Sequence, residues 1–161
     1  MEKKELDWGN IGFTYMTTDK RYVAEYKDGA WGEGALTSDP NVVINECAGI
    51  LQYCQECFEG LKAYTTEDGS IVTFRPDLNA ERMMDSAARL EMPPFPKERF
   101  LEAVDAVVKA NAAWVPPFGS GATLRQSLGN DYTSGSVRLD LSQRIPWRQR
   151  IESQSPGNDI Y

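Results

Sequence analysis

The sequence predicts an α+β fold, in which an antiparallel sheet of hairpins is followed by two packed helices. Two stretches near residues 21–31 and 62–74 alternate polar and apolar residues around turn residues, as β-hairpins do. Two later stretches place apolar residues at helical spacing. The chain has 161 residues, of which 41% are hydrophobic and 11% aromatic, and this composition suits a folded chain with its own core. We therefore expect one main domain over residues 1–124.

The first hairpin is predicted in "RYVAEYKDGAWGEG", where apolar residues alternate on both sides of Asp28-Gly29. An Asp-Gly pair favours a tight two-residue turn because both residues tolerate positive φ. A short β-branched run follows at residues 42–44, before a stretch broken by glycine.

The second hairpin is predicted in "GLKAYTTEDGSIVTFRP". Residues 62–65 and 71–74 form its strands, and the Glu67-Asp68-Gly69 turn joins them. Pro76 ends the second strand because proline cannot donate a ladder hydrogen bond.

Two helices are predicted after this hairpin. The first lies within "DLNAERMMDSAARLEM", with Asp77 or Asn79 as its cap. The second lies within "KERFLEAVDAVVKANAAW", and the proline-rich link "EMPPFPK" separates the two. The expected buried residues are Ala80, Met83, Met84, Ala87 and Ala88 in the first helix, and Phe100, Leu101, Val104, Val107 and Val108 in the second.

The composition changes after Leu124. Residues 125–161 contain no Ala and no Lys, but five Arg, four Gln and six Ser. We find no sustained helical or strand period there, and we expect an atypically packed or disordered tail.

Composition also limits the chemistry. The chain has no histidine, so Ser-His and Cys-His pairs and imidazole metal ligands are excluded. Its net charge of −7 argues against nucleic acid or an anionic membrane as a partner. We see neither a membrane-spanning run nor a signal peptide, and we expect a cytoplasmic location.

The "YCQECFEGLKAY" stretch contains a Cys-x-x-Cys pair, Cys54 and Cys57. A redox pair needs a helix N-terminus after a strand, and this context is missing. A zinc site needs four ligands, and the chain has only three cysteines. We therefore interpret both residues as small, partly buried residues near a turn, with no metal site.

Three other features have both a functional and a structural interpretation. Arg82, near the start of the first helix, could bind an anion, although a salt bridge to Asp85 or Asp77 is favoured by the residues alone. Gly60 could mark a close backbone approach, a positive φ or an ordinary turn. The aromatic residues Tyr53 and Phe58 would ordinarily belong to a core.

Several motifs together resemble the N-terminal small domain of branched-chain aminotransferases, which are fold-type IV enzymes that use pyridoxal 5'-phosphate. The resemblance covers roughly residues 10–124 and implies the D-amino acid aminotransferase-like fold. It rests on "YVAEYKDGAW", "QYCQECFEGLKAY", "FRPDLNAERMMDSAARLEMP", "FLEAVDAVVKANAAWVPP" and "GSGATL", in this order.

The resemblance implies transfer of the amino group of leucine, isoleucine or valine to 2-oxoglutarate, commonly by a homodimer. It implies that Arg82 binds the cofactor phosphate. It places Tyr53 and Phe58 in the substrate side-chain pocket, with Gly60 where the chain approaches that pocket and Lys62 at its margin.

The chain also departs from the family pattern. In the family "GSGATL" leads into a Tyr-Ile-Arg-Pro strand, whereas this chain continues "RQSLGNDY". The family's larger domain carries the lysine that forms a Schiff base with the cofactor, and none of the seven lysines here matches its motif. We assign no catalytic residue and expect the chain alone to be inactive. A frame change after Leu124 is one hypothesis for the altered tail.

Two alternatives remain open. The chain could be a non-catalytic remnant that binds a partner or itself through an uncovered apolar face. It could also come from a related fold-type IV transaminase or lyase with another substrate.

Overall fold

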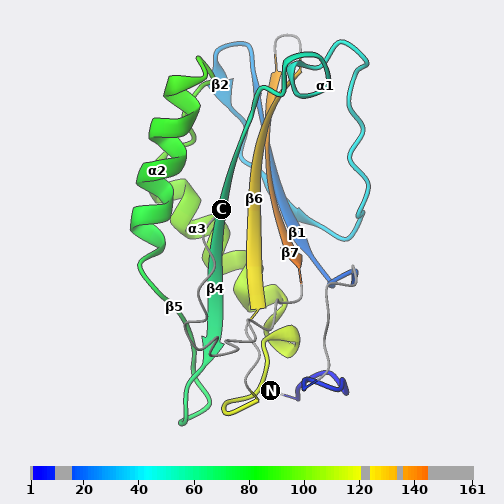
Figure 1. Ribbon diagram of the computed structural model, residues 1–161, viewed down its shortest axis with the longest axis vertical. Coiled ribbons are helices and arrows are strands. Elements are labelled where there is room, and N and C mark those ends of the chain that lie inside the picture. The colour runs from blue at the N-terminus through cyan, green and yellow to red at the C-terminus, as the bar shows by residue number, and fades with distance from the viewer. Residues whose placement is uncertain (1, 10–15, 121–123, 134–135, 145–161) are drawn as a thin grey trace, which may run out of the picture.

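The computed structural model describes residues 2–9, 16–120, 124–133 and 136–144, the last two ranges as backbone only. The described strands form one seven-stranded antiparallel sheet in the order β2-β1-β7-β6-β4-β5, with β3 paired to β1 (Figure 1). The strands are β1 Arg21–Lys27, β2 Ala30–Trp31, β3 Ala35–Thr37, β4 Glu56–Thr65, β5 Ile71–Thr73, β6 Leu124–Thr133 and β7 Ser136–Arg144. The helices are α1 Gly49–Tyr53, α2 Pro76–Arg89 and α3 Lys97–Ala110, and a 3-10 turn, η1, spans Ala112–Trp114.

The two long helices pack together and cover one face of the sheet (Figure 1). The predicted arrangement, an antiparallel sheet with two packed helices, is confirmed. Short α1 lies near one end of the sheet, close to β6.

Both predicted hairpins are present. In the first, Asp28 and Gly29 have φ of 52° and 85°, so a turn with two positive φ angles joins β1 to β2. Tyr26 pairs with Trp31 across it. In the second, β4 and β5 pair from Ala63–Thr73 to Thr65–Ile71. The first strand of this hairpin is longer than predicted, because β4 begins at Glu56.

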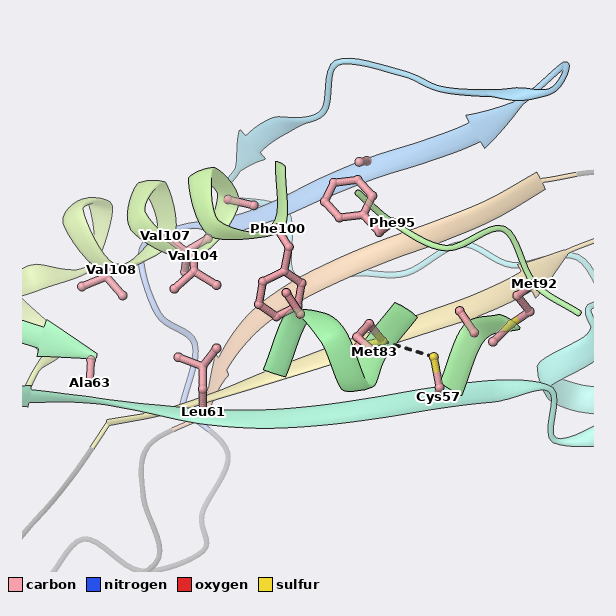
Figure 2. Close-up of a cluster of buried hydrophobic side chains, with 14 of the residues drawn as sticks. Cys57, Leu61, Ala63, Met83, Met92, Phe95, Phe100, Val104, Val107 and Val108 are labelled. Atoms are coloured by element: carbon pink, nitrogen blue, oxygen red, sulfur yellow. Dashed lines mark hydrogen bonds between the residues drawn. The ribbon is translucent and has the colours of Figure 1, made fainter. Parts of the chain in front are cut away.

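The core lies between the sheet and the two helices (Figure 2). Met83, Phe95, Phe100 and Val107 are fully buried there. Leu61 and Ala63 of β4 close the core from the sheet side. The helical spacing predicted most of this core, but Ala88 is exposed, and Met84 and Leu101 are only half-buried.

Helix α2 starts earlier than predicted. Its first residue is Pro76, and Arg75 occupies the N-cap position with a left-handed backbone, φ 46° and ψ 52°. Proline suits the first helical position because its missing N–H has no helical acceptor there. The prediction that Asp77 or Asn79 caps the helix is therefore wrong, and Arg82 lies beyond the first turn.

Three segments differ in structure from what their sequence suggests. Residues 42–44 form no strand in the structure. Gly60 is not a turn residue, because it lies inside β4 and pairs with Ser127. The backbone of residues 124–133 and 136–144 forms central strands of the sheet, so these residues are not a disordered tail. The domain boundary at residue 124 stays a prediction. Residues 121–123 and 145–161 lie outside the described residues.

Candidate functional site

Strand β4 carries the predicted pocket motif and has two different faces. Cys57, Leu61 and Ala63 point into the helix-covered core and are buried. Phe58, with an exposed side chain, and Lys62 lie on the alternate, exposed face, together with Gly60. This separation follows from the period of two in a strand. The same segment therefore supplies core residues and candidate site residues.

One edge of β4 is open along its first half. Strand β6 pairs with β4 from Glu56 to Ala63, whereas β5 pairs only from Ala63 onward. Helix α2 lies along this open edge. The side-chain amide of Asn79 donates a hydrogen bond of 3.1 Å to the carbonyl oxygen of Gly60. This bond joins the helix directly to the backbone of β4.

Arg82 forms an ion pair with Glu59 across the same junction. Arg82 Nε donates to Glu59 Oε1 at 3.0 Å, and Arg82 Nη2 donates to Glu59 Oε2 at 2.9 Å. These hydrogen bonds raise the pKa of Arg82 above its ordinary value. The salt bridge favoured by the residues alone is present, but its partner is Glu59 rather than Asp85 or Asp77.

Glu59 is the better shielded partner of this pair. Its side chain is 13% exposed, whereas that of Arg82 is 57% exposed. Asn79, which is buried, donates a further hydrogen bond of 2.7 Å to Glu59 Oε2. The carboxylate is thus held from two sides by α2.

An open pocket of about 350 Å³ lies at this junction. Three basic side chains line it: Lys62 from β4, Arg75 from the α2 N-cap and Arg82 from the second turn of α2. Among the described residues, Lys62 forms no ion pair. The other lining residues are Gly60, Leu61, Tyr64, Phe74, Leu78 and Asn79.

Arg75 is held by its neighbour Asp77. Its Nε and Nη2 donate to the Asp77 carboxylate at 2.7–3.2 Å. The hydrogen bonds from Arg75 lower the pKa of Asp77 to about 2. Both arginines are charged and each is oriented by an ion pair with a carboxylate, so the pocket suits an anion.

The structure brings together three of the five predicted site residues. Gly60, Lys62 and Arg82 line the pocket, whereas Tyr53 and Phe58 are not part of its lining. Tyr53 ends α1 and is 84% exposed, and Phe58 is 56% exposed. Their role in a substrate pocket stays a prediction.

Sequence reasoning missed Glu59 and Asn79, and with them the ion pair that holds Arg82. The alternation of β4 places Glu59 on the side of the strand that faces the core. A carboxylate shielded in this way needs a partner, and this could have indicated the ion pair. Arg75 was also missed.

The two cysteines of the Cys-x-x-Cys pair differ in environment. Cys57 is buried in β4, and burial raises the pKa of its thiol to about 11. Cys54 is exposed, at the C-cap of α1. Their expected partial burial thus fails for Cys54, and Cys57 is a poor thiolate former. In the part of the chain that is described, no group of three or more Cys, Asp or Glu residues is arranged to hold a metal ion.

Comparison with known proteins identifies relatives of this chain. No family model matches the chain. The branched-chain-amino-acid aminotransferase of Haemophilus influenzae is 56% identical over 121 residues, which are 75% of this chain and 35% of that protein. That of Helicobacter pylori is 46% identical over 121 residues, 75% of this chain and 36% of that protein. A methionine aminotransferase of Arabidopsis thaliana is 43% identical over 117 residues, 72% of this chain and 33% of that protein.

Solved structures share the fold. A branched-chain amino acid aminotransferase from T.th., solved with pyridoxamine 5'-phosphate, matches with a TM-score of 0.65 at 17% identity, over 86% of this chain and 43% of that one. The predicted resemblance to branched-chain aminotransferases and the fold-type IV class are thereby confirmed. The chain spans about a third of the length of the curated relatives it matches.

Proposed function

We propose that this chain carries the phosphate-binding part of a pyridoxal 5'-phosphate site in a branched-chain aminotransferase. The observation that carries the proposal is the pocket that Lys62 and Arg82 both line, together with Gly60. A pocket lined by three basic side chains favours a phosphate group, because guanidinium groups bind phosphate oxygens through paired hydrogen bonds. The cofactor, when bound, supplies an electron sink at the carbon that carries the amino group.

Each residue has a distinct part in this proposal. Arg82 binds the phosphate, and Lys62 adds a second positive charge at the pocket margin. Gly60 leaves room for close approach, since it has no side chain. Tyr53 and Phe58 contribute apolar walls for the side chain of leucine, isoleucine or valine. 2-Oxoglutarate is the proposed amino acceptor.

The chain alone is proposed to bind the phosphate group without catalysing amino transfer. None of its lysines matches the family's Schiff-base motif, and no catalytic residue is assigned. A cytoplasmic location and a homodimer belong to the same proposal. Among the described residues, no helix is both long and apolar enough to cross a membrane.

The test compares two ligands that differ only in the phosphate. Pyridoxamine 5'-phosphate and pyridoxamine are suitable because neither condenses with lysine amines. Equilibrium dialysis should show that the wild-type chain binds the phosphorylated ligand at least about tenfold more tightly, as expected for hydrogen bonds to charged groups. Arg82→Lys should remove most of this difference, since lysine lacks the guanidinium fork.

Arg89→Lys is the matched control for the change from guanidinium to ammonium, because Arg89 is an exposed residue at the end of α2 outside the pocket lining. This variant should keep the preference for the phosphorylated ligand. Equal binding of both ligands by the wild-type chain would contradict the proposal. Leucine-dependent consumption of 2-oxoglutarate by the chain alone would contradict its proposed inactivity.

A second candidate function is an interaction module. Several large apolar side chains are exposed, among them Phe58, Phe74 at 81% and Tyr53. Exposed aromatic residues of this kind favour self-association. Sedimentation velocity distinguishes the two: concentration-dependent assembly without a phosphate preference supports the module. A related transaminase with another substrate stays an alternative, and the methionine aminotransferase relative supports it.

A further inference from the structure

We propose that Glu59 and Asn79 are positioning residues that orient the guanidinium group of Arg82 for an anion in the pocket. This inference rests on the proposed function, because it concerns the same site. Neither residue needs to touch the ligand. Their role is to fix the direction of the Arg82 guanidinium group, which contacts the ligand.

The donor count of Arg82 supports this role. A guanidinium group has five N–H donors in one plane. Glu59 accepts one hydrogen bond from Nε and one from Nη2. Both hydrogens of Nη1 and the second hydrogen of Nη2 remain, and no described residue accepts them. One Nη1 hydrogen and the free Nη2 hydrogen lie parallel and form a second edge that can bind an anion through two hydrogen bonds, and Arg82 lines the pocket. An ion pair with Glu59 is therefore compatible with binding a phosphate at the same time.

Glu59 is itself held in place by its neighbours, so it can orient the side chain of Arg82. Its backbone belongs to β4, paired with Leu128 of β6. Its carboxylate is largely shielded from solvent and receives the hydrogen bond of 2.7 Å from Asn79. Asn79 in turn bonds the carbonyl oxygen of Gly60 at 3.1 Å. Both hydrogens of the Asn79 amide are thus used to tie α2 to β4.

A flexible arginine loses side-chain entropy when it binds an anion. The ion pair with Glu59 restricts Arg82 before the ligand arrives, so less entropy is lost on binding. The negative charge of Glu59 also offsets part of the positive charge of Arg82, and this opposes anion binding. We infer that orientation is the larger of the two effects, so that removing Glu59 weakens binding.

The experiment uses Glu59→Gln and Asn79→Ala. A glutamine at position 59 keeps the size of the side chain but places an N–H₂ group against the donors of Arg82 or Asn79. Pyridoxamine 5'-phosphate should bind about three- to tenfold more weakly to each variant, in line with the loss of one or two hydrogen bonds. Binding of pyridoxamine should not change. Glu67→Gln, in the exposed turn between β4 and β5, is the matched control for the charge and should bind like the wild type.

A second measurement separates positioning from general stability. The Nε–H signal of Arg82 in a nitrogen-15 NMR spectrum is identified by its loss in Arg82→Lys. Its hydrogen exchange should be slow in the wild-type chain and faster in Glu59→Gln, while Glu67→Gln should leave it slow. Circular dichroism checks that each variant is folded. If Glu59→Gln exchanges as slowly as the wild type, or binds pyridoxamine 5'-phosphate as tightly or more tightly, the inference is wrong.

The failure of the proposed function gives a different result. In that case the wild-type chain would show no preference for the phosphorylated ligand, and Arg82→Lys would change nothing. The Nε–H exchange still decides whether Glu59 fixes Arg82. If exchange is slow in the wild-type chain and fast in Glu59→Gln, Glu59 does orient Arg82. The proposal that Arg82 binds a phosphate would still be wrong.

Discussion

The thiol of Cys57 and the thioether of Met83 meet in the core, with their sulfur atoms 3.2 Å apart (Figure 2). Cys57 belongs to β4 and Met83 to α2, and both are buried. Glu59 lies two residues after Cys57, and Arg82 directly precedes Met83; these two residues form the ion pair of the candidate site. The sulfur contact and the ion pair therefore join the same strand and helix, one inside the core and one at its margin.

This arrangement predicts that Met83 stabilises the fold much more than Met84. Met83 is fully buried, whereas Met84 is half-buried on the same helix. Met83→Ala should lower the free energy of unfolding by about 2–5 kcal/mol, because it removes apolar contacts and leaves a cavity. Met84→Ala should cost about 1 kcal/mol or less. Urea unfolding measures both, and equal losses would contradict the observed burial.

The burial of Cys57 predicts a loss of stability at high pH. Its thiol has a pKa of about 11 in the folded chain, against an ordinary value of 9.0. The unfolded chain therefore loses this proton first as the pH rises. The stabilising contribution is complete below pH 9 and falls as the pH passes from about 9 to about 11.

Other groups titrate in the same range, so the comparison needs a variant. Cys57→Ala should show a smaller fall in unfolding free energy between pH 9 and 11 than the wild-type chain. Iodoacetamide gives an independent measurement: Cys54, which is exposed, should react at pH 8, and Cys57 should react only after unfolding. Rapid labelling of Cys57 in the folded chain would contradict its burial.

Local signals in the sequence predicted much of the fold. The Asp28-Gly29 turn and the apolar spacing of the two helices are short-range patterns, and residues a few positions apart decide them. The start of α2 was missed because the left-handed conformation of Arg75 has no strong sequence signal. Arginine rarely adopts this conformation, whereas glycine and asparagine favour it.

The strands after residue 124 were missed for a different reason. Val137, Leu139 and Leu141 alternate with polar residues, which is a strand pattern, but it is short and lies among many arginine, glutamine and serine residues. The change of composition was weighted more heavily than this alternation. Pairing of β7 with β1 joins segments more than 100 residues apart, and such pairing leaves no local signal.

The candidate site shows the same limit. Arg82 was singled out from its type and place on a helix, but its partner Glu59 lies 23 residues earlier on a strand. Only the packing of α2 along the open edge of β4 brings the two together. Asn79 was interpreted as a cap, because asparagine is common at helix N-termini. Its amide instead joins the helix to the strand.

Asn111 is predicted to be a major stabilising residue outside the site. It is fully buried after α3, and its side chain accepts from Lys20 N at 3.0 Å and donates to Lys20 O at 2.8 Å. Asn111→Ala should lower the free energy of unfolding by about 2–4 kcal/mol, because the N–H and C=O groups of half-buried Lys20 lose their partner. Asn45→Ala, at an exposed turn, is the control and should cost about 1 kcal/mol or less. Equal melting temperatures of the two variants would contradict this role.

The two faces of β4 predict that stability and ligand binding can be separated within one strand. Leu61 is 4% exposed in the core, and Phe58 is 56% exposed on the opposite face. Leu61→Ala should lower the unfolding free energy by about 2–4 kcal/mol, whereas Phe58→Ala should change it by about 0.5 kcal/mol or less. If Phe58 is a wall of the substrate pocket, Phe58→Ala should instead weaken binding of an N-(5'-phosphopyridoxyl)-leucine conjugate more than binding of pyridoxamine 5'-phosphate. Equal weakening of both ligands would place Phe58 outside that pocket, and a large loss of stability would show that its exposed face is packed in solution.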